Sequence, residues 1–132
     1  MTDNNPFEAM MKMSQDWAKS MNVDMEAFTP KGFEKLWPTM SKETMEMFFG
    51  KGINPEGLDA KTRLMLTLAG LTVLGAQAEA QIRLTVRHLV EAGATKQEIA
   101  EVIAQMGMFA GVPAMTKAME LATEVLEKDE SA

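Results

Sequence analysis

Apolar residues recur every three or four positions along most of the chain, and short breaks containing Gly or Pro separate these runs. Such spacing places the apolar side chains on one face of a helix. No Asn-Gly or Asp-Gly turn joins two alternating runs, so we expect no strands. The pattern predicts an all-α fold whose helices cover residues 6–21, 41–49, 60–75, 77–92, 95–110 and 113–127.

The break between residues 77–92 and 95–110 carries the clearest signals of helix ends. Gly93 suits the left-handed backbone that often ends a helix. Thr95 and Glu98 form a capping box, in which both side chains satisfy backbone N–H groups of the first turn. Because one helix stops and the next starts within about two residues, we expect an antiparallel hairpin at the centre of a helical bundle.

The helix expected over residues 60–75 is apolar on nearly every side, and Asp59 is placed to cap its start. Burial on most sides exceeds what a few neighbouring helices supply. We therefore expect this helix to make a contact between subunits as well.

The first part of the chain is rich in methionine, with nine of the 14 Met residues before residue 48. Met is flexible and suits both loose core packing and adaptable contact surfaces, and the sequence leaves both open. We expect three parts: a Met-rich helical extension over residues 1–57, a helical core over 58–127 and a loose charged tail over 128–132.

Composition excludes several classes of function. The chain of 132 residues has no Cys and one His, so thiolate nucleophiles and Cys- or His-rich metal sites are excluded, and we expect neither a metal nor a cofactor. A net charge of −6 argues against nucleic-acid binding. No secretory signal or membrane span is visible, so we expect a cytoplasmic protein.

Several short strings within residues 58–127 occur together in one known family. They are Lys61-Thr62-Arg63, the run from Ile82 to Arg87, Ala92-Gly93-Ala94-Thr95, Glu98-Ile99, Glu101-Val102 and the run from Phe109 to Ala114. The chain thereby resembles the carboxymuconolactone decarboxylase family, which also contains AhpD-like alkylhydroperoxidases. The resemblance implies an all-helical fold in the AhpD-like, peroxiredoxin-like superfamily and assembly as a homo-oligomer, either a trimer or a hexamer.

The peroxidase chemistry of such proteins does not fit this chain. It uses two Cys three residues apart and a His four residues later, which helical spacing brings to one face. The corresponding positions hold Ala78, Gln81 and Thr85, and the upstream Glu of that type falls near Leu66. We therefore expect no Cys-dependent peroxide reduction.

The decarboxylase chemistry is also incomplete. The resemblance places a His at Thr85 and a Tyr at Phe109, and both polar groups are missing. Decarboxylation needs a cation to hold the carboxylate and an acid to protonate the carbanion. Arg83 and Arg87 supply the charge, while the acid is not evident.

His88 is the one candidate for a relocated acid, since it continues the row of residues 78, 81 and 85 by one turn. The alternative is a partly exposed surface or interface His. Thr85 is either a nucleophile or a buried hydroxyl bonded to its own helix. The candidate catalytic residues are His88, Thr85 and Arg87, and the candidate substrate-binding residues are Gln81, Arg83, Gln105 and Phe109.

Two hypotheses of function follow. The first is a divergent, non-catalytic oligomeric binding protein whose Met-rich first 47 residues form its contact surface. The second is a decarboxylase-like lyase that acts on a small lactone or organic acid through the relocated site. The lost polar groups favour the first.

Overall fold

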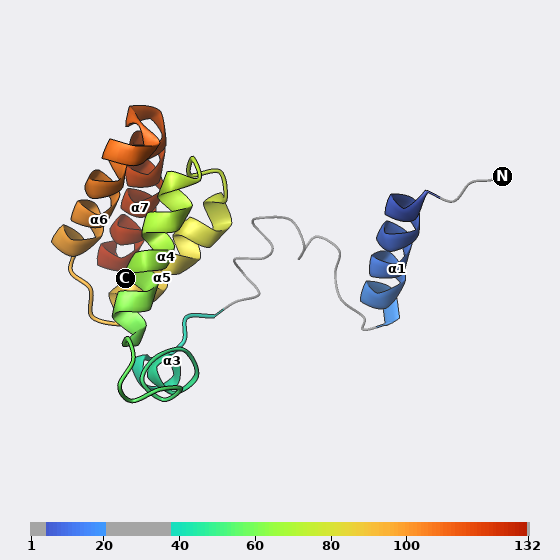
Figure 1. Ribbon diagram of the computed structural model, residues 1–132, viewed down its shortest axis with the longest axis horizontal. Helices are drawn as coiled ribbons and strands as arrows, with labels where there is room; N and C mark the ends of the chain where they lie inside the picture. Colours follow the sequence, from blue (N-terminus) through green and yellow to red (C-terminus); the bar gives the residue numbers. More distant parts are fainter. Residues whose placement is uncertain (1–4, 21–37, 132) are drawn as a thin grey trace. The chain divides into compact units, whose positions relative to one another are not determined.

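The computed structural model describes residues 5–20 and 38–131, and every regular element in these ranges is a helix. The predicted all-α fold is therefore confirmed. The chain divides into two compact units, Met1–Leu36 and Trp37–Ala132. The first contains α1, and the second contains the remaining helices (Figure 1). Their bounds are α1 Pro6–Ser20, α3 Lys42–Phe49, α4 Ala60–Val73, α5 Glu79–Glu91, α6 Lys96–Ala110 and α7 Val112–Ser131.

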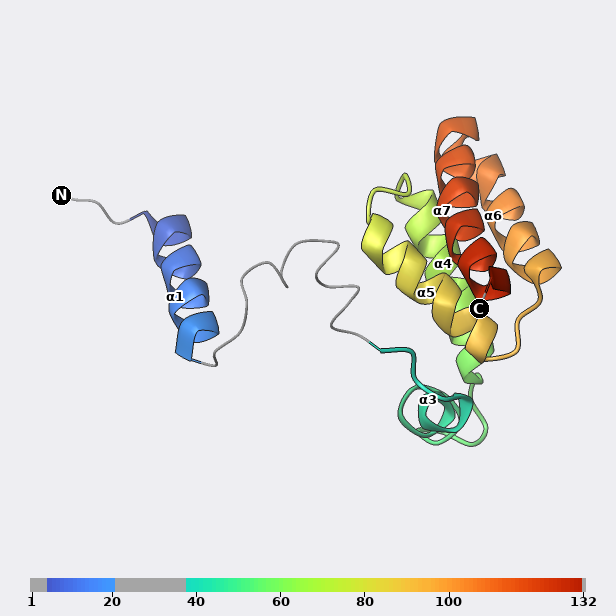
Figure 2. The same cartoon turned by 180° about the vertical axis from the view of Figure 1, so that it is seen from behind.

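Helices α4 to α7 form a four-helix bundle, with α3 packed at the start of α4. Each of α4 and α7 packs extensively on both α5 and α6. The pairs α5–α6 and α4–α7 make much smaller contacts, so they lie across the diagonals of the bundle (Figures 1 and 2). The two helices of the hairpin expected from the sequence, α5 and α6, therefore touch each other only slightly. They follow each other across a short connection, but their apolar stripes pack mainly on α4 and α7.

The bundle core is built from aliphatic side chains of all four helices. Leu68, Ile82, Val86, Leu89, Ile99 and Ile103 are fully buried, as is Ala118 of α7. Met45 of α3 is also 0% exposed and belongs to this core.

Because Met45 anchors α3, the compact unit begins at Trp37 and not at residue 58, where the sequence suggested a boundary. At the other end, α7 continues to Ser131, although residues 128–132 were expected to be a loose tail. Residues 126–131 contain no Gly or Pro to stop the helix.

Three of the helix ends carry the capping residues that the sequence predicted. Asp59 accepts a hydrogen bond from the Thr62 N–H at 2.9 Å, and the Thr95–Glu98 capping box is present. Gly93 has φ 96°, and the N–H groups of Gly93 and Ala94 donate to Val90 and Leu89 carbonyls. This is the Schellman arrangement, which satisfies carbonyls of the last helical turn.

Part of the apolar surface of α4 is not covered within one chain, and the contact between subunits that the sequence led us to expect for it stays a prediction. Leu64 and Leu68 are buried, but Leu66 is 58% exposed and Leu74, just after the helix, is 76% exposed. Among the described residues, no helix is long and apolar enough to cross a membrane.

Candidate functional site

Thr85 lies on α5 and is buried, with 7% of its surface exposed. Its hydroxyl donates to the carbonyl oxygen of Gln81, one turn earlier, at 2.7 Å. This is the ordinary way in which a helical Thr satisfies its hydroxyl. Of the two interpretations of Thr85, the structure favours the hydroxyl bonded to its own helix over the nucleophile.

His88 is buried, with 8% exposed, and not a surface residue. The Met40 backbone N–H donates to its Nε2 at 3.1 Å. Nε2 is therefore the acceptor, so Nδ1 carries the proton and donates to the Leu84 carbonyl oxygen at 2.8 Å. Both ring nitrogens are engaged by backbone groups. His88 thus ties the segment before α3 to α5, which neither interpretation of the sequence included.

Arg83 takes part in a small network of ion pairs at the surface. Its guanidinium lies 3.4 Å from the Glu79 carboxylate and 3.1 Å from that of Glu124. Lys117 lies 3.2 Å from Glu79. Two cations and two anions thus balance one another. Arg83 faces α7, and holding a substrate carboxylate there would compete with these pairs.

The remaining candidates on α5 differ in exposure. Gln81 is exposed at the surface, whereas Arg87 is half-buried. The row from Gln81 to His88 therefore runs from solvent towards the junction of α5 with the segment before α3.

Gln105 lines a shallow hollow of about 360 Å³ between α4 and α6. Its other lining residues are Met65, Leu66, Ala69, Glu98, Glu101, Val102 and Met106, and none comes from α5. Phe109 is 71% exposed near the end of α6. The structure of one chain thus places the α5 candidates and the α6 candidates on diagonal helices and does not gather them at this hollow.

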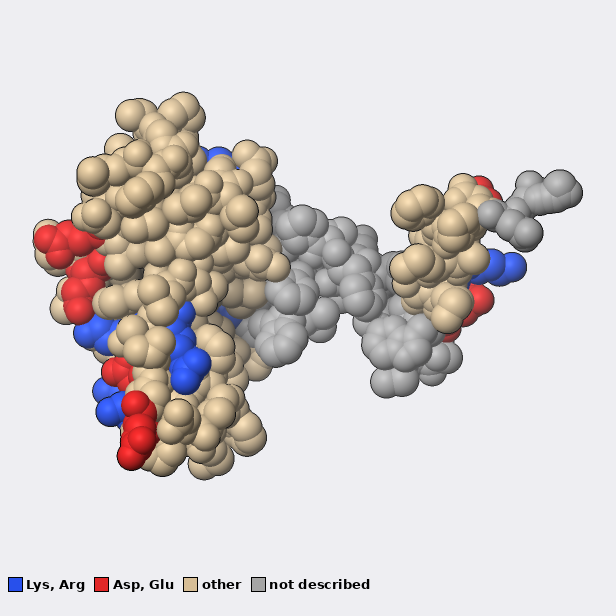
Figure 3. Space-filling view, in the orientation of Figure 1, with Lys and Arg blue, Asp and Glu red and all other residues tan. Residues whose placement is uncertain are grey.

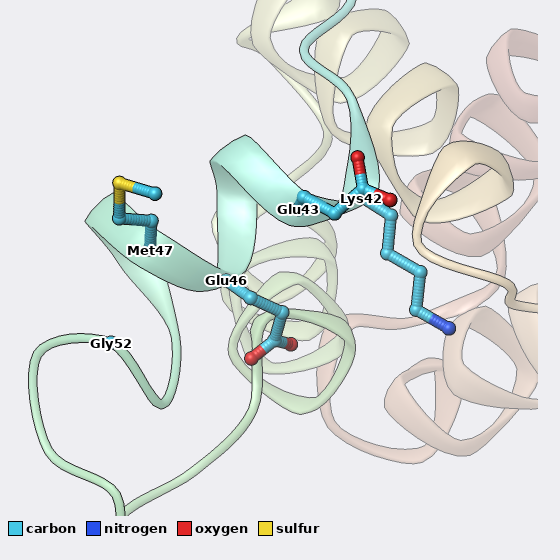
Figure 4. A pocket seen from close by; sticks show the side chains of 5 residues that line it. All are labelled: Lys42, Glu43, Glu46, Met47 and Gly52. Carbon is cyan, nitrogen blue, oxygen red and sulfur yellow. The ribbon is translucent and has the colours of Figure 1, made fainter.

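A second hollow, of about 460 Å³, lies beside α3 and is lined by Lys42, Glu43, Glu46, Met47 and Gly52 (Figure 4). Glu46 is not a free acid there. Its Oε1 accepts the Ala60 N–H at 2.7 Å and its Oε2 accepts the Lys51 N–H at 3.1 Å. The carboxylate therefore fastens the loop after α3 and the start of α4.

A sequence profile described as "Carboxymuconolactone decarboxylase family" matches residues 38–124. The chain belongs to the carboxymuconolactone decarboxylase family. The match starts within the segment that His88 binds and includes α3, so it agrees in extent with the compact unit that begins at Trp37. With no Cys in its sequence, this member of the family lacks the Cys-x-x-Cys motif.

The chain is similar in sequence to two curated proteins, one of which is named for an activity. The chain is 53% identical over 125 residues, 94% of its length and 93% of the relative's, to an uncharacterized 15.0 kDa protein in the nqo9–nqo10 intergenic region of Paracoccus denitrificans. It is 38% identical over 71 residues, 54% of its length, to a 4-carboxymuconolactone decarboxylase of Acinetobacter baylyi. That second match spans 52% of the relative's length.

Sequence reasoning missed Glu46 and Met40, although both hold this carboxymuconolactone decarboxylase-family fold together. The partner of Glu46 at the start of α4 is 14 residues away, and Met40 is 48 residues from His88. For Glu46 the sequence holds one weak signal, the glycine at position 50. A side chain there would collide with the contact, since a Cβ would lie 2.5 Å from Oε2 of Glu46 and 2.8 Å from the Ala60 nitrogen. For Met40 no local sequence pattern signals the hydrogen bond to His88.

Proposed function

We propose that this chain is a non-catalytic member of the carboxymuconolactone decarboxylase family that acts as an oligomeric binding protein. The observation that carries the proposal is the state of the polar groups on α5. The Thr85 hydroxyl and both nitrogens of His88 are bonded to backbone groups. Acid–base catalysis needs a group that can exchange a proton with the substrate, and these bonds use up that capacity.

The contact surface for a partner is the Met-rich face of α1. On this face Phe7, Met10 and Met11 expose 63–77% of their surface, within the described part of the helix. Met side chains adapt to different partners at little energetic cost. A helix with one such face binds into an apolar groove of another protein.

Catalysis is tested with 4-carboxymuconolactone, the substrate that the name of the Acinetobacter relative implies. Purified protein is mixed with the lactone and its consumption is followed. The proposal expects consumption no faster than in buffer. Turnover that disappears in His88→Ala or Thr85→Val would contradict it.

Partner binding is tested separately by affinity capture and mass spectrometry. The bait is compared with a Met10→Glu/Met11→Glu double variant and with a Lys12→Glu variant of the opposite face, which changes the net charge by the same amount. We expect the captured proteins to be lost only in the double variant. Any deletion should end at residue 36, because a cut at residue 50 would also remove Met45 and Glu46. Identical captured sets from all three baits would reject α1 as the contact surface.

The identity to the Acinetobacter decarboxylase favours one second candidate, a decarboxylase-like lyase acting on a small lactone or organic acid. In that case Arg83 and Arg87 would hold the substrate carboxylate, and Gln81, Gln105 and Phe109 would line the site. If this candidate is right, both Arg87→Leu and Arg83→Leu should strongly lower kcat/KM for the lactone. Arg83→Leu should also lower the stability of the protein, because it breaks two surface ion pairs.

A further inference from the structure

One end of the bundle carries no charge along two long stretches of sequence. Residues 64–78 and 102–116 contain no Asp, Glu, Lys or Arg, in a chain whose charged fraction is 24%. The first stretch covers most of α4 and the connection to α5. The second covers most of α6, Gly111 and the start of α7.

The fold brings these two stretches to the same end of the molecule. The α4–α5 and α6–α7 connections lie together at one end of the bundle, away from α3 (Figures 1 and 2). On the face that the space-filling view shows, this end carries few charged side chains, and most acidic and basic side chains lie nearer α3 (Figure 3). We name it the uncharged end and define it by the exposed apolar residues of these two connections and the helix turns beside them, Val73, Leu74, Met108, Phe109 and Val112.

The uncharged end is apolar and open to solvent. Its five defining residues each expose 44–79% of their surface. A standard interface buries roughly 800 Å² on each partner and is depleted of charge at its centre. Contiguous exposed apolar patches on soluble proteins mark interaction sites.

The backbone that follows Leu74 forms a closed turn. After Leu74, Gly75 has φ 98° and Ala76 has φ 56°, and the Ala76 side chain is fully buried. The N–H groups of Gly75 and Ala76 donate to the Thr72 and Leu71 carbonyls, so the turn is closed by its own hydrogen bonds. A surface that is ordered before binding loses less conformational entropy on association.

Charge decides between the possible occupants. The ionic residues nearest in sequence to the uncharged end are Lys61, Arg63, Glu79, Glu101 and Lys117, which are of mixed sign, and Glu79 pairs with Lys117. An anionic membrane would call for a basic rim, which this end lacks. Two copies of a chain with net charge −6 repel each other, and the repulsion is least where both surfaces carry no charge.

We propose that the uncharged end is the surface through which copies of this chain associate, with Leu74 and Phe109 as its anchors. This rests on the oligomeric part of the proposed function and specifies the surface that serves it. An apolar, uncharged surface is complementary to itself, so a two-fold contact between identical ends satisfies both copies.

The absence of Cys from the sequence gives a direct test in the full-length chain. Single Leu74→Cys and Phe109→Cys variants are treated with a short bismaleimide at micromolar concentration. Phe48→Cys is the matched control, since Phe48 is 69% exposed but lies on α3. We expect covalent dimers from both end variants and at least tenfold less from the control.

Sedimentation of Leu74→Glu/Phe109→Glu supplies the energetic test, with Phe48→Glu as control and circular dichroism as the check on folding. Loss of interface anchors should raise the dissociation constant roughly 10- to 100-fold. If the double variant keeps the mass of the unmodified chain and the end variants do not crosslink, the uncharged end is not the interface, while the oligomeric proposal stands. If the unmodified chain is itself a monomer, both proposals fall. If Phe48→Glu weakens association as much as Leu74→Glu/Phe109→Glu does, the uncharged end is likewise rejected as the specific interface.

Discussion

Glu46 joins α3 to the following loop and to the start of α4, because its two carboxylate oxygens each accept one hydrogen bond, from the Ala60 and Lys51 N–H groups. Replacing it with Ala leaves the part-buried Ala60 donor without this acceptor. We expect Glu46→Ala to lower the free energy of unfolding by about 1–3 kcal/mol, the usual consequence of removing one partner from a buried hydrogen bond. Urea denaturation measures the change. Glu43→Ala, an exposed neighbour on α3, should stay within about 0.5 kcal/mol, and equal losses in both would contradict the role given to Glu46.

His88 and Gln105 were both site candidates, and their environments predict opposite results. His88→Ala removes the acceptor for the Met40 N–H and the donor to Leu84, so we expect a loss of about 1–3 kcal/mol and faster hydrogen exchange at the Met40 amide. Gln105→Ala changes an exposed side chain and should be nearly neutral. Unchanged exchange at Met40 in His88→Ala would remove the case for a structural His88.

These residues show how far single positions could be interpreted from the sequence. The buried, self-bonded hydroxyl of Thr85 was one of two predicted outcomes, because its partner at Gln81 is one helical turn away. The partner of His88 was not predictable, because it lies 48 residues away in a segment without a helical pattern. Local hydrogen bonds follow from helix geometry, whereas long-range ones depend on how the elements pack.

For whole helices, too, local features could be predicted from the sequence and long-range packing could not. The helix starts at Asp59 and Thr95 and the stop at Gly93 were predicted, because each is fixed by the side chain or backbone preference of nearby residues. The diagonal placement of α5 and α6 was not predicted, because every helix of the bundle has an apolar stripe and the stripes do not specify their neighbours.

The caps make the stability of α4 and α6 depend on pH. Hydrogen bonds from Thr62 lower the pKa of Asp59 below its ordinary 3.8, and Lys61, 2.8 Å away, with the Thr95 N–H lowers the pKa of Glu98 below 4.5. Carboxyl groups with lowered pKa values stabilise the fold above their unfolded pKa, and this is lost as pH falls through the folded value. We expect the free energy of unfolding to decrease below about pH 4.

The Asp59→Asn variant separates the contribution of Asp59 to the pH dependence of stability from that of Glu98. Asn caps a helix about as well as Asp and does not titrate in this range. Its free energy of unfolding should stay near that of the unmodified chain at pH 7 and fall less between pH 5 and pH 2, as measured by urea denaturation at each pH. Identical pH profiles would show that Asp59 contributes nothing to the acid sensitivity.

At the scale of the whole molecule, the exposed apolar end and the net charge of −6 act against each other. Association buries the apolar side chains of the uncharged end but brings two anionic bodies together. Screening by salt weakens the repulsion and leaves apolar burial unchanged, so association should strengthen as ionic strength rises. If association involved oppositely charged surfaces, salt would weaken it instead.

Association also couples stability to concentration, because copies that bind each other only when folded stabilise the native state by mass action. For a dimer, a tenfold rise in concentration adds about 1.4 kcal/mol per mole of dimer to the free energy of unfolding. We expect the thermal midpoint of the unmodified chain to rise steadily with concentration, and that of Leu74→Glu/Phe109→Glu to rise much less. Scanning calorimetry over two decades of concentration distinguishes the two. A midpoint independent of concentration in the unmodified chain would mean that the bundle is stable alone, with its uncharged end in water.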